Sequence, residues 1–171
     1  AARFVPRAVR LETDTGVPGG LGLVLDDSGA GPRLSVGAAA HPSVSHATLA
    51  ALGEAFASWK WIQHLALSNR AVPGDAVDLD LETRVLWWTQ SDRWTGLEWL
   101  WRGPAETVGD HHEPALVLHD LVARLRDLGE DVIVVDLTTE PLAVQLGYHV
   151  VAVLVPGFHP LYLRERRPAL F

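Results

Sequence analysis

The 171-residue sequence contains no cysteine and no methionine, and Lys60 is its only lysine. Without cysteine the chain can form neither disulfides nor thiolate metal sites, which is compatible with a reducing cytoplasm. Without methionine, residue 1 is not the initiator of a primary translation product, so we expect a processed or partial polypeptide. The glycine spacing that precedes a P-loop lysine is absent before Lys60, which argues against a P-loop nucleotide site.

Long apolar runs and excess positive charge are also missing. No run approaches the roughly 18–20 apolar residues that a membrane span needs, and the formal charge is -7 at pH 7. Binding to a phosphate backbone relies on clustered Lys and Arg, so nucleic acid is not an expected partner. Hydrophobic residues make up 48% of the chain and charged residues 20%, which suits a folded core. We expect a cytoplasmic domain, or one large piece of a domain, over residues 1–171.

The first forty residues have the pattern of paired strands. The apolar run 21–25 predicts one strand and residues 33–40 predict a second, joined by the turn-rich segment 26–32. The glycines at 19, 20 and 22 match no phosphate-binding fingerprint. We interpret them as positions of turns and close backbone approach.

A long helix is predicted next, from Ser43 or Ser45 as N-cap to about Leu67. The neighbouring face of this helix carries Glu54 among small residues, which leaves room for another helix or a ligand to approach the carboxylate. The expected core face is an apolar stripe at helical spacing, formed by Leu49, Leu52, Phe56, Trp59 and Ile62.

Tryptophan is concentrated between residues 72 and 110, where we expect a long loop over the core with one or two short strands. Tryptophan is large and usually packed, so core or flap packing explains most of these residues. A groove for an apolar peptide would use the same residues. The candidates for such a peptide-binding site are Trp94, Trp99 and Trp101.

The last third predicts an amphipathic helix over 115–128, ended by Gly129. Residues 131–137 form a β-branched run of the kind that is buried, and 150–155 predict another strand beyond a short helix that ends near Gly147. The two strands are expected to be neighbours in one sheet, under the right-handed crossover rule if they are parallel. The fold class expected is α/β (α+β), a mixed β-sheet with packed helices.

No pattern supports a metal site in this chain. Adjacent side chains at His111 and His112 point apart, and the HExxH spacing is absent. Asp26 and Asp27 belong to an Asp-Asp-Ser-Gly stretch that is ordinary turn chemistry.

Several of these segments, in this order, resemble the YcaO family. The strand–turn–strand LVLDDSGAGP at 23–32 and VGAAAH at 36–41 precede ALGEA at 51–55, which fits the family's Ala-Leu-x-Glu-Ala helix. Near the end, GYHVV at 147–151 and VPGFHPL at 155–161 resemble its closing strands and its Val-Pro-Gly-x-x-Pro-Leu signature. The resemblance extends from about residue 16 to 163.

The resemblance implies ATP-dependent activation of a peptide amide. YcaO proteins phosphorylate a backbone carbonyl oxygen during attack by a side-chain or external nucleophile, which gives azolines, thioamides or amidines in ribosomally made peptide natural products. Magnesium ions held by glutamates clamp the nucleotide phosphates. By this resemblance Glu54 is the residue expected near ATP and Mg²⁺, and no catalytic residue is assigned.

The chain also departs from the family. The glutamate-rich helices of the family's first half have no counterpart, and Ala57 and Trp59 stand where many members carry Gln and Arg. The resemblance therefore implies the C-terminal half of a split YcaO-like domain, with ATP and Mg²⁺ bound by a complex and not by this chain alone. The implied partners are the complementary N-terminal half, a precursor peptide and a leader-peptide-binding protein. The alternative is a non-catalytic scaffold or a precursor-peptide-binding module of the same fold.

Overall fold

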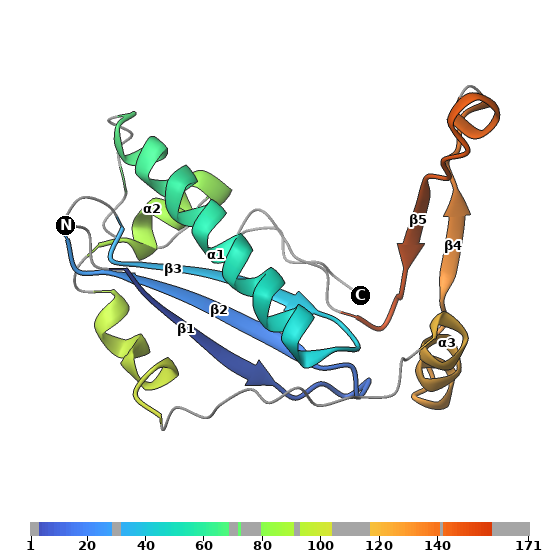
Figure 1. The fold of residues 1–171 in the computed structure, drawn as a ribbon, viewed down its shortest axis with the longest axis horizontal. Coiled ribbons are helices and arrows are strands. Elements are labelled where there is room, and N and C mark those ends of the chain that lie inside the picture. The colour runs from blue at the N-terminus through green and yellow to red at the C-terminus, as the bar shows by residue number, and fades with distance from the viewer. Residues whose placement is uncertain are drawn as a thin grey trace. The chain divides into compact units, whose positions relative to one another are not determined.

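The computed structural model describes residues 4–28, 32–68, 72, 80–90, 93–103, 117–140 and 142–158, with the backbone alone for Trp94, Thr95 and Leu142. The chain divides into two compact units, described separately below. Unit 1 comprises residues 1–115 with 162–171, and unit 2 comprises residues 116–161. The described strands form antiparallel sheets accompanied by helices (Figure 1), so the α+β class is confirmed.

Unit 1 is built on a three-stranded antiparallel sheet. Its strands are β1 (Phe4–Leu11), β2 (Gly19–Asp26) and β3 (Leu34–Ala40), in the spatial order β1-β2-β3. The predicted pairing of the segments 21–25 and 33–40 is confirmed, and β1 completes the sheet on the other side of β2. The central strand holds Leu23 and Val24, both fully buried.

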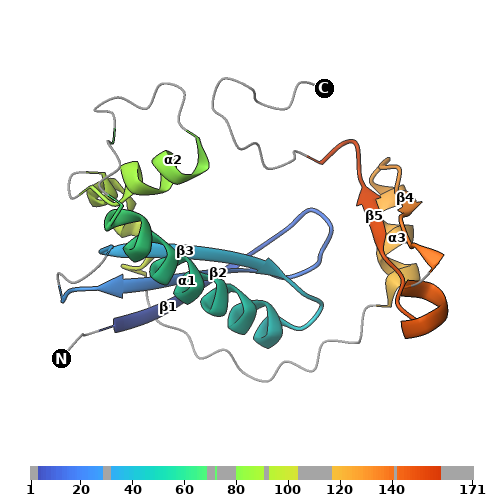
Figure 2. The same cartoon turned by 90° about the horizontal axis from the view of Figure 1, so that it is seen from above.

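Helix α1 (Val44–Ala66) crosses one face of this sheet (Figure 2). Ser43 is its N-cap, as predicted, and its side chain accepts a hydrogen bond from the His46 N–H. The strands are glycine-rich where the helix crosses. A Cβ added at Gly22 would lie only 2.4 Å from the carbonyl carbon of Ala51, so the helix backbone rests directly on the strand. Close backbone approach is thus confirmed for Gly20 and Gly22, whereas the turn interpretation is wrong because all three glycines lie within β2.

The face of α1 that packs on the sheet is not the predicted stripe. Leu49 is 67% exposed and Phe56 is 37% exposed, and of the predicted stripe only Ile62 is buried. Bulky side chains cannot fit where two backbones approach so closely, so small residues occupy the contact instead. The buried residues of α1 are Val44, Ala47, Ala51, Ala55, Ile62 and Leu65.

The tryptophan-rich segment is helical where the structure describes it. Helix α2 (Leu81–Trp88) begins at Asp80, whose side chain accepts a hydrogen bond from the Thr83 N–H at 2.8 Å. The 3₁₀ helix η1 (Trp94–Leu100) follows. The described part of 72–110 contains two helices and no strand, so for these residues the prediction of a loop with short strands is wrong. The aspartate cap and the helix-forming residues after it explain the difference.

Unit 2 consists of helix α3 (Leu118–Asp127), strand β4 (Ile133–Asp136), the π-helical turn η2 (Leu142–Leu146) and strand β5 (Val151–Leu154). Gly129, at φ 84°, follows α3 as predicted, and Gly147, at φ 65°, follows η2. The two strands are neighbours, as predicted, but they are antiparallel, so the crossover rule does not apply. All four residues of β4 are exposed, and the expectation of a buried strand is wrong for the described chain.

Candidate functional site

Glu54 lies on α1 where the helix passes the outer edge of the sheet. Its Oε2 atom accepts a hydrogen bond from the backbone N–H of Ala38, at 2.8 Å. Arg33 and His41, at the two ends of β3, make backbone hydrogen bonds to the β2 side of the sheet. Because these bonds alternate along an antiparallel pair, the odd-numbered residues of β3 direct their backbone N–H and C=O groups toward β2. The N–H of Ala38 therefore points away from β2, and Glu54 bonds to the open edge of the strand.

The residues around this hydrogen bond hold α1 close to β3. A Cβ added at Gly37 would lie 2.5 Å from the amide nitrogen of Ala55 and 2.7 Å from the Cβ of Glu54. Two residues before Gly37 on β3, the buried Ser35 hydroxyl donates to the carbonyl oxygen of Ala55 at 2.8 Å. The absence of a side chain at Gly37 and the bond from Ser35 together place the Glu54 carboxylate over the edge of β3.

The chemistry open to Glu54 is limited by this bond. The side chain is exposed, and Ala38 is its hydrogen-bond partner among the described residues. Oε1 is left to accept another bond or to bind a cation, and carboxylate oxygens are the ligands that Mg²⁺ prefers. The role of Glu54 near ATP and Mg²⁺ stays a prediction, with one carboxylate oxygen available as a ligand. Within the described ranges, no group of three or more His, Cys, Asp or Glu side chains is arranged to hold a metal ion.

The three tryptophans proposed for peptide binding lie on or next to η1. Trp99 is 71% exposed, and Trp101 is half-buried. The side chain of Trp94 lies outside the described part of the structure, as do His111 and His112. No ring contact or hydrogen bond of the described residues joins Glu54 to Trp99. The peptide-binding role of all three stays a prediction.

Comparison with known proteins assigns this sequence to a family. The sequence profile of the YcaO cyclodehydratases, a family described as binding ATP and Mg²⁺, matches residues 1–159. The chain belongs to the YcaO family. No curated protein sequence matches it.

Two solved structures share the fold of this YcaO chain. One is a heterocyclase in complex with substrate and cofactor, at 20% sequence identity and a TM-score of 0.59, over 90% of this chain and 20% of that one. The other is the heterocyclase TruD, at 21% identity and a TM-score of 0.55, over 88% of this chain and 19% of that one. The YcaO chain therefore spans about a fifth of the length of these heterocyclases.

One buried acidic residue of the YcaO chain was not predicted as such. Asp26, at the end of β2, is 1% exposed. Its Oδ1 accepts the Ser28 N–H at 2.8 Å, which confirms the turn interpretation. Its Oδ2 is buried and has no hydrogen-bond partner among the residues that the structure describes. The signal that was available is alternation, because Asp26 shares the α1-facing side of β2 with Gly22 and Val24.

None of the described helices is long and apolar enough to cross a membrane.

Proposed function

We propose that this YcaO chain is one subunit of a split, cytoplasmic enzyme that uses ATP to modify backbone amides in a ribosomally made peptide. The observation that carries the proposal is the family match over residues 1–159 in a chain that spans about a fifth of the length of the solved heterocyclases. A partner polypeptide supplies the complementary N-terminal half with its glutamate-rich helices. A precursor peptide and a leader-peptide-binding protein complete the assembly. Azoline formation agrees best with the names of the structural neighbours, ahead of thioamide or amidine formation.

In this proposal Glu54 lies next to the bound nucleotide. ATP supplies the phosphoryl group that activates the amide oxygen, and Mg²⁺ neutralises the charge on its phosphates. The bond from Ala38 to Oε2 restricts the rotamers of Glu54 and keeps Oε1 in one place, which lowers the entropy lost on binding a cation. Glu54 contributes one oxygen ligand, and the partner contributes the remaining carboxylates.

Replacement of Glu54 by glutamine or by alanine separates its charge from its hydrogen bond. Glu54→Gln keeps a carbonyl oxygen that can accept the Ala38 N–H but removes the negative charge, whereas Glu54→Ala removes both. Titration calorimetry with Mg-ATP should show no binding to the isolated chain and clear binding to the complex. In the complex, Glu54→Gln should weaken Mg-ATP about tenfold, the effect of losing one charged contact.

The control for this experiment is Glu12→Gln, because the Glu12 side chain is 84% exposed and belongs to the same unit. Its affinity for Mg-ATP should equal that of the unmodified complex. Tight binding of Mg-ATP by the isolated chain would contradict the split site. An unchanged affinity in Glu54→Gln would remove Glu54 from it.

The alternative function, a scaffold or precursor-peptide-binding module, is favoured by two observations. The bond between Glu54 and Ala38 gives the carboxylate a structural role that needs no nucleotide. Trp99 also offers a large exposed ring for an apolar peptide side chain. In that case Glu54→Gln leaves turnover unchanged, while Trp99→Ala and Trp101→Ala weaken binding of the precursor peptide. The reverse result supports a catalytic subunit.

A further inference from the structure

The β4–β5 hairpin of unit 2 is apolar on both of its faces, except for Asp136 at the end of β4. Directly paired residues lie on the same side of a sheet, so the register sorts the eight strand residues into two faces. The face that we call the Ile133 face contains Ile133, Val135, Ala152 and Leu154. The opposite face, the Val134 face, contains Val134, Asp136, Val151 and Val153.

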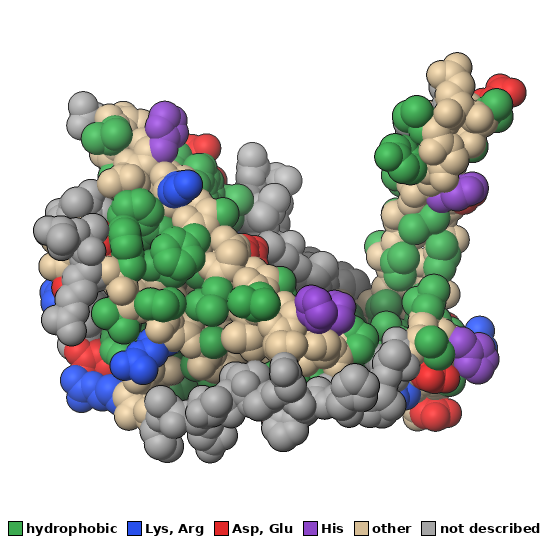
Figure 3. Space-filling model, viewed as in Figure 1, with side chains coloured by type: hydrophobic (Ala, Val, Ile, Leu, Met, Phe, Trp, Pro, Cys, Tyr) green, Lys and Arg blue, Asp and Glu red, His purple; other side chains and the backbone are tan. Residues whose placement is uncertain are grey.

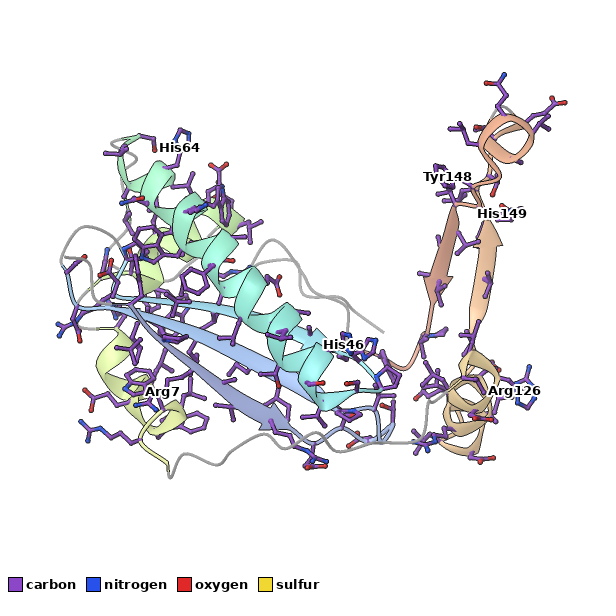
Figure 4. All side chains as sticks on the ribbon, in the orientation of Figure 1. Arg7, His46, His64, Arg126, Tyr148 and His149 are labelled. Carbon is purple, nitrogen blue, oxygen red and sulfur yellow. The ribbon has the colours of Figure 1, made fainter. Side chains whose placement is uncertain are left out.

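Both faces are exposed. On the Ile133 face Leu154 is 57% exposed, and on the Val134 face Val134 is 60% and Val153 is 56% exposed. Helix α3 does not cover either face, because Leu125 is the one buried residue among those described in unit 2. Figure 3 shows hydrophobic side chains along the hairpin. Apolar exposure continues to Tyr148, which is 65% exposed and lies with His149 where the hairpin meets η2 (Figure 4).

Among the described residues, no third strand pairs with either edge of the hairpin. Neither IVVD in β4 nor VAVL in β5 contains proline or lysine, the residues with which proteins usually protect a strand edge. Strands that are apolar on both sides belong in the interior of a sheet covered by layers above and below. Two four-residue strands are also too few for an independently stable sheet. The hairpin therefore has the composition of central strands, and the described residues of unit 2 do not supply the cover that such strands need.

We infer that the β4–β5 hairpin is the docking site for the partner polypeptide of the proposed split enzyme, which adds strands to its edges and covers both faces. The identity of the partner rests on the proposed function. A second copy of this chain fits less well, because a two-fold contact joins one face or one edge to its own equivalent and leaves the opposite face exposed. The solved heterocyclases are about five times longer than this chain, so their fold includes polypeptide that can supply both layers.

Hydrogen exchange measured by mass spectrometry tests the site directly. The full chain is compared alone and in complex with the polypeptide that carries the family's glutamate-rich half. The amides of β4 and β5 should exchange rapidly in the isolated chain and about 100-fold more slowly in the complex. Protection of these amides already in the isolated chain would show that the chain covers its own hairpin. That result, or unchanged exchange in the complex, would overturn the inference.

Lysine substitutions test the two faces separately. Ile133→Lys and Val134→Lys each place a charge on a different face, and each should weaken the complex about 100-fold. The control is Leu67→Lys, because Leu67 is 78% exposed at the end of α1 in the other unit and should not affect affinity. A tight complex in both hairpin variants would refute the docking site.

The same variants distinguish this inference from the proposed function. If the complex forms through the hairpin but neither binds Mg-ATP nor modifies a peptide, the docking site stands and the enzymatic proposal fails. If the complex is active and both lysine variants leave it intact, the enzymatic proposal stands and the docking site fails. If the isolated chain sediments as a dimer that only one of the two variants dissociates, a second copy occupies the hairpin and the inference is wrong.

Discussion

Replacing Gly37 with alanine is expected to push α1 away from β3. The added Cβ would lie 2.5 Å from the carbonyl oxygen of Ala51 and from the amide nitrogen of Ala55. These are backbone atoms that cannot swing aside, so the helix must move by about 1 Å to restore ordinary van der Waals contact. Overpacking costs about 1–3 kcal/mol. We expect the upper end of this range, because backbone meets backbone at this crossing.

The displacement of α1 should also change the candidate site. The Ala38 nitrogen and the Glu54 Oε2 atom are 2.8 Å apart, and a shift of about 1 Å would break this hydrogen bond. The Gly37→Ala variant is therefore expected to lose both stability and the fixed position of the carboxylate. For a chain of this length, a loss of about 3 kcal/mol lowers Tm by roughly 6–12 °C.

Thermal and urea denaturation followed by circular dichroism measure this effect, with Gly53→Ala as the matched control. Gly53 lies within α1, and a Cβ there meets nothing within 4 Å. Alanine inside a helix is more favourable than glycine by about 0.5–1 kcal/mol, so this variant should gain stability. The same substitution thus has opposite signs at two positions. A loss below about 1 kcal/mol in Gly37→Ala would refute the close approach of helix and strand.

Three further predictions concern other parts of the chain. Gly129→Ala should destabilise unit 2 by about 1 kcal/mol in urea denaturation, because Gly129 has a φ of 84° that alanine adopts only with strain. Leu86→Ala should cost about 2–5 kcal/mol in the same assay because Leu86 is 5% exposed, whereas Trp99→Ala should cost less than about 1 kcal/mol because Trp99 is 71% exposed. Side-chain and backbone hydrogen bonds from Thr138 lower the pKa of Asp136 below its usual 3.8. Because the pKa of Asp136 is lower in the folded state, the ionised carboxylate stabilises the fold above about pH 4, and this contribution is lost as the pH falls through the folded-state pKa. NMR titration of the Asp136 and Thr138 resonances measures this pKa.

Local signals in the sequence predicted where most elements begin and end, but not which surfaces they bury. Ser43 and Gly129 marked helix ends correctly, because caps depend on a few neighbouring residues. The predicted core face of α1 was wrong because the prediction considered only the hydrophobicity of residues such as Leu49 and Phe56. The buried face of α1 is determined by the glycines of the sheet, Gly22 in β2 and Gly37 in β3. The helix backbone lies so close to these glycines that only small side chains fit between helix and sheet.

The candidate site was only partly accessible from the sequence. Glu54 was singled out by a motif and by its small neighbours, and both features concern the helix itself. Its bond to Ala38 depends on the register of β3 and on which of its N–H groups point outward, and these are properties of strand pairing. The burial of Asp26 required the same information. Long-range pairing is the part of the site that patterns along a single chain do not contain.

The sheets of the two units differ in how their edges are protected, and this difference bears on where a partner can add strands. In unit 1, the residue that pairs with Pro6 of β1 is Val24, and the backbone hydrogen bonds of Val24 point toward β3. The backbone nitrogen of Pro6 therefore faces outward at the edge of the sheet, and as a proline it has no N–H to donate to an added strand. At the opposite edge, the outward-pointing N–H of Ala38 already donates a hydrogen bond to the Glu54 carboxylate. Both edges of this sheet thus resist an added strand. The β4–β5 hairpin has neither device, so sheet extension by another polypeptide is favoured in unit 2 and not beside Glu54.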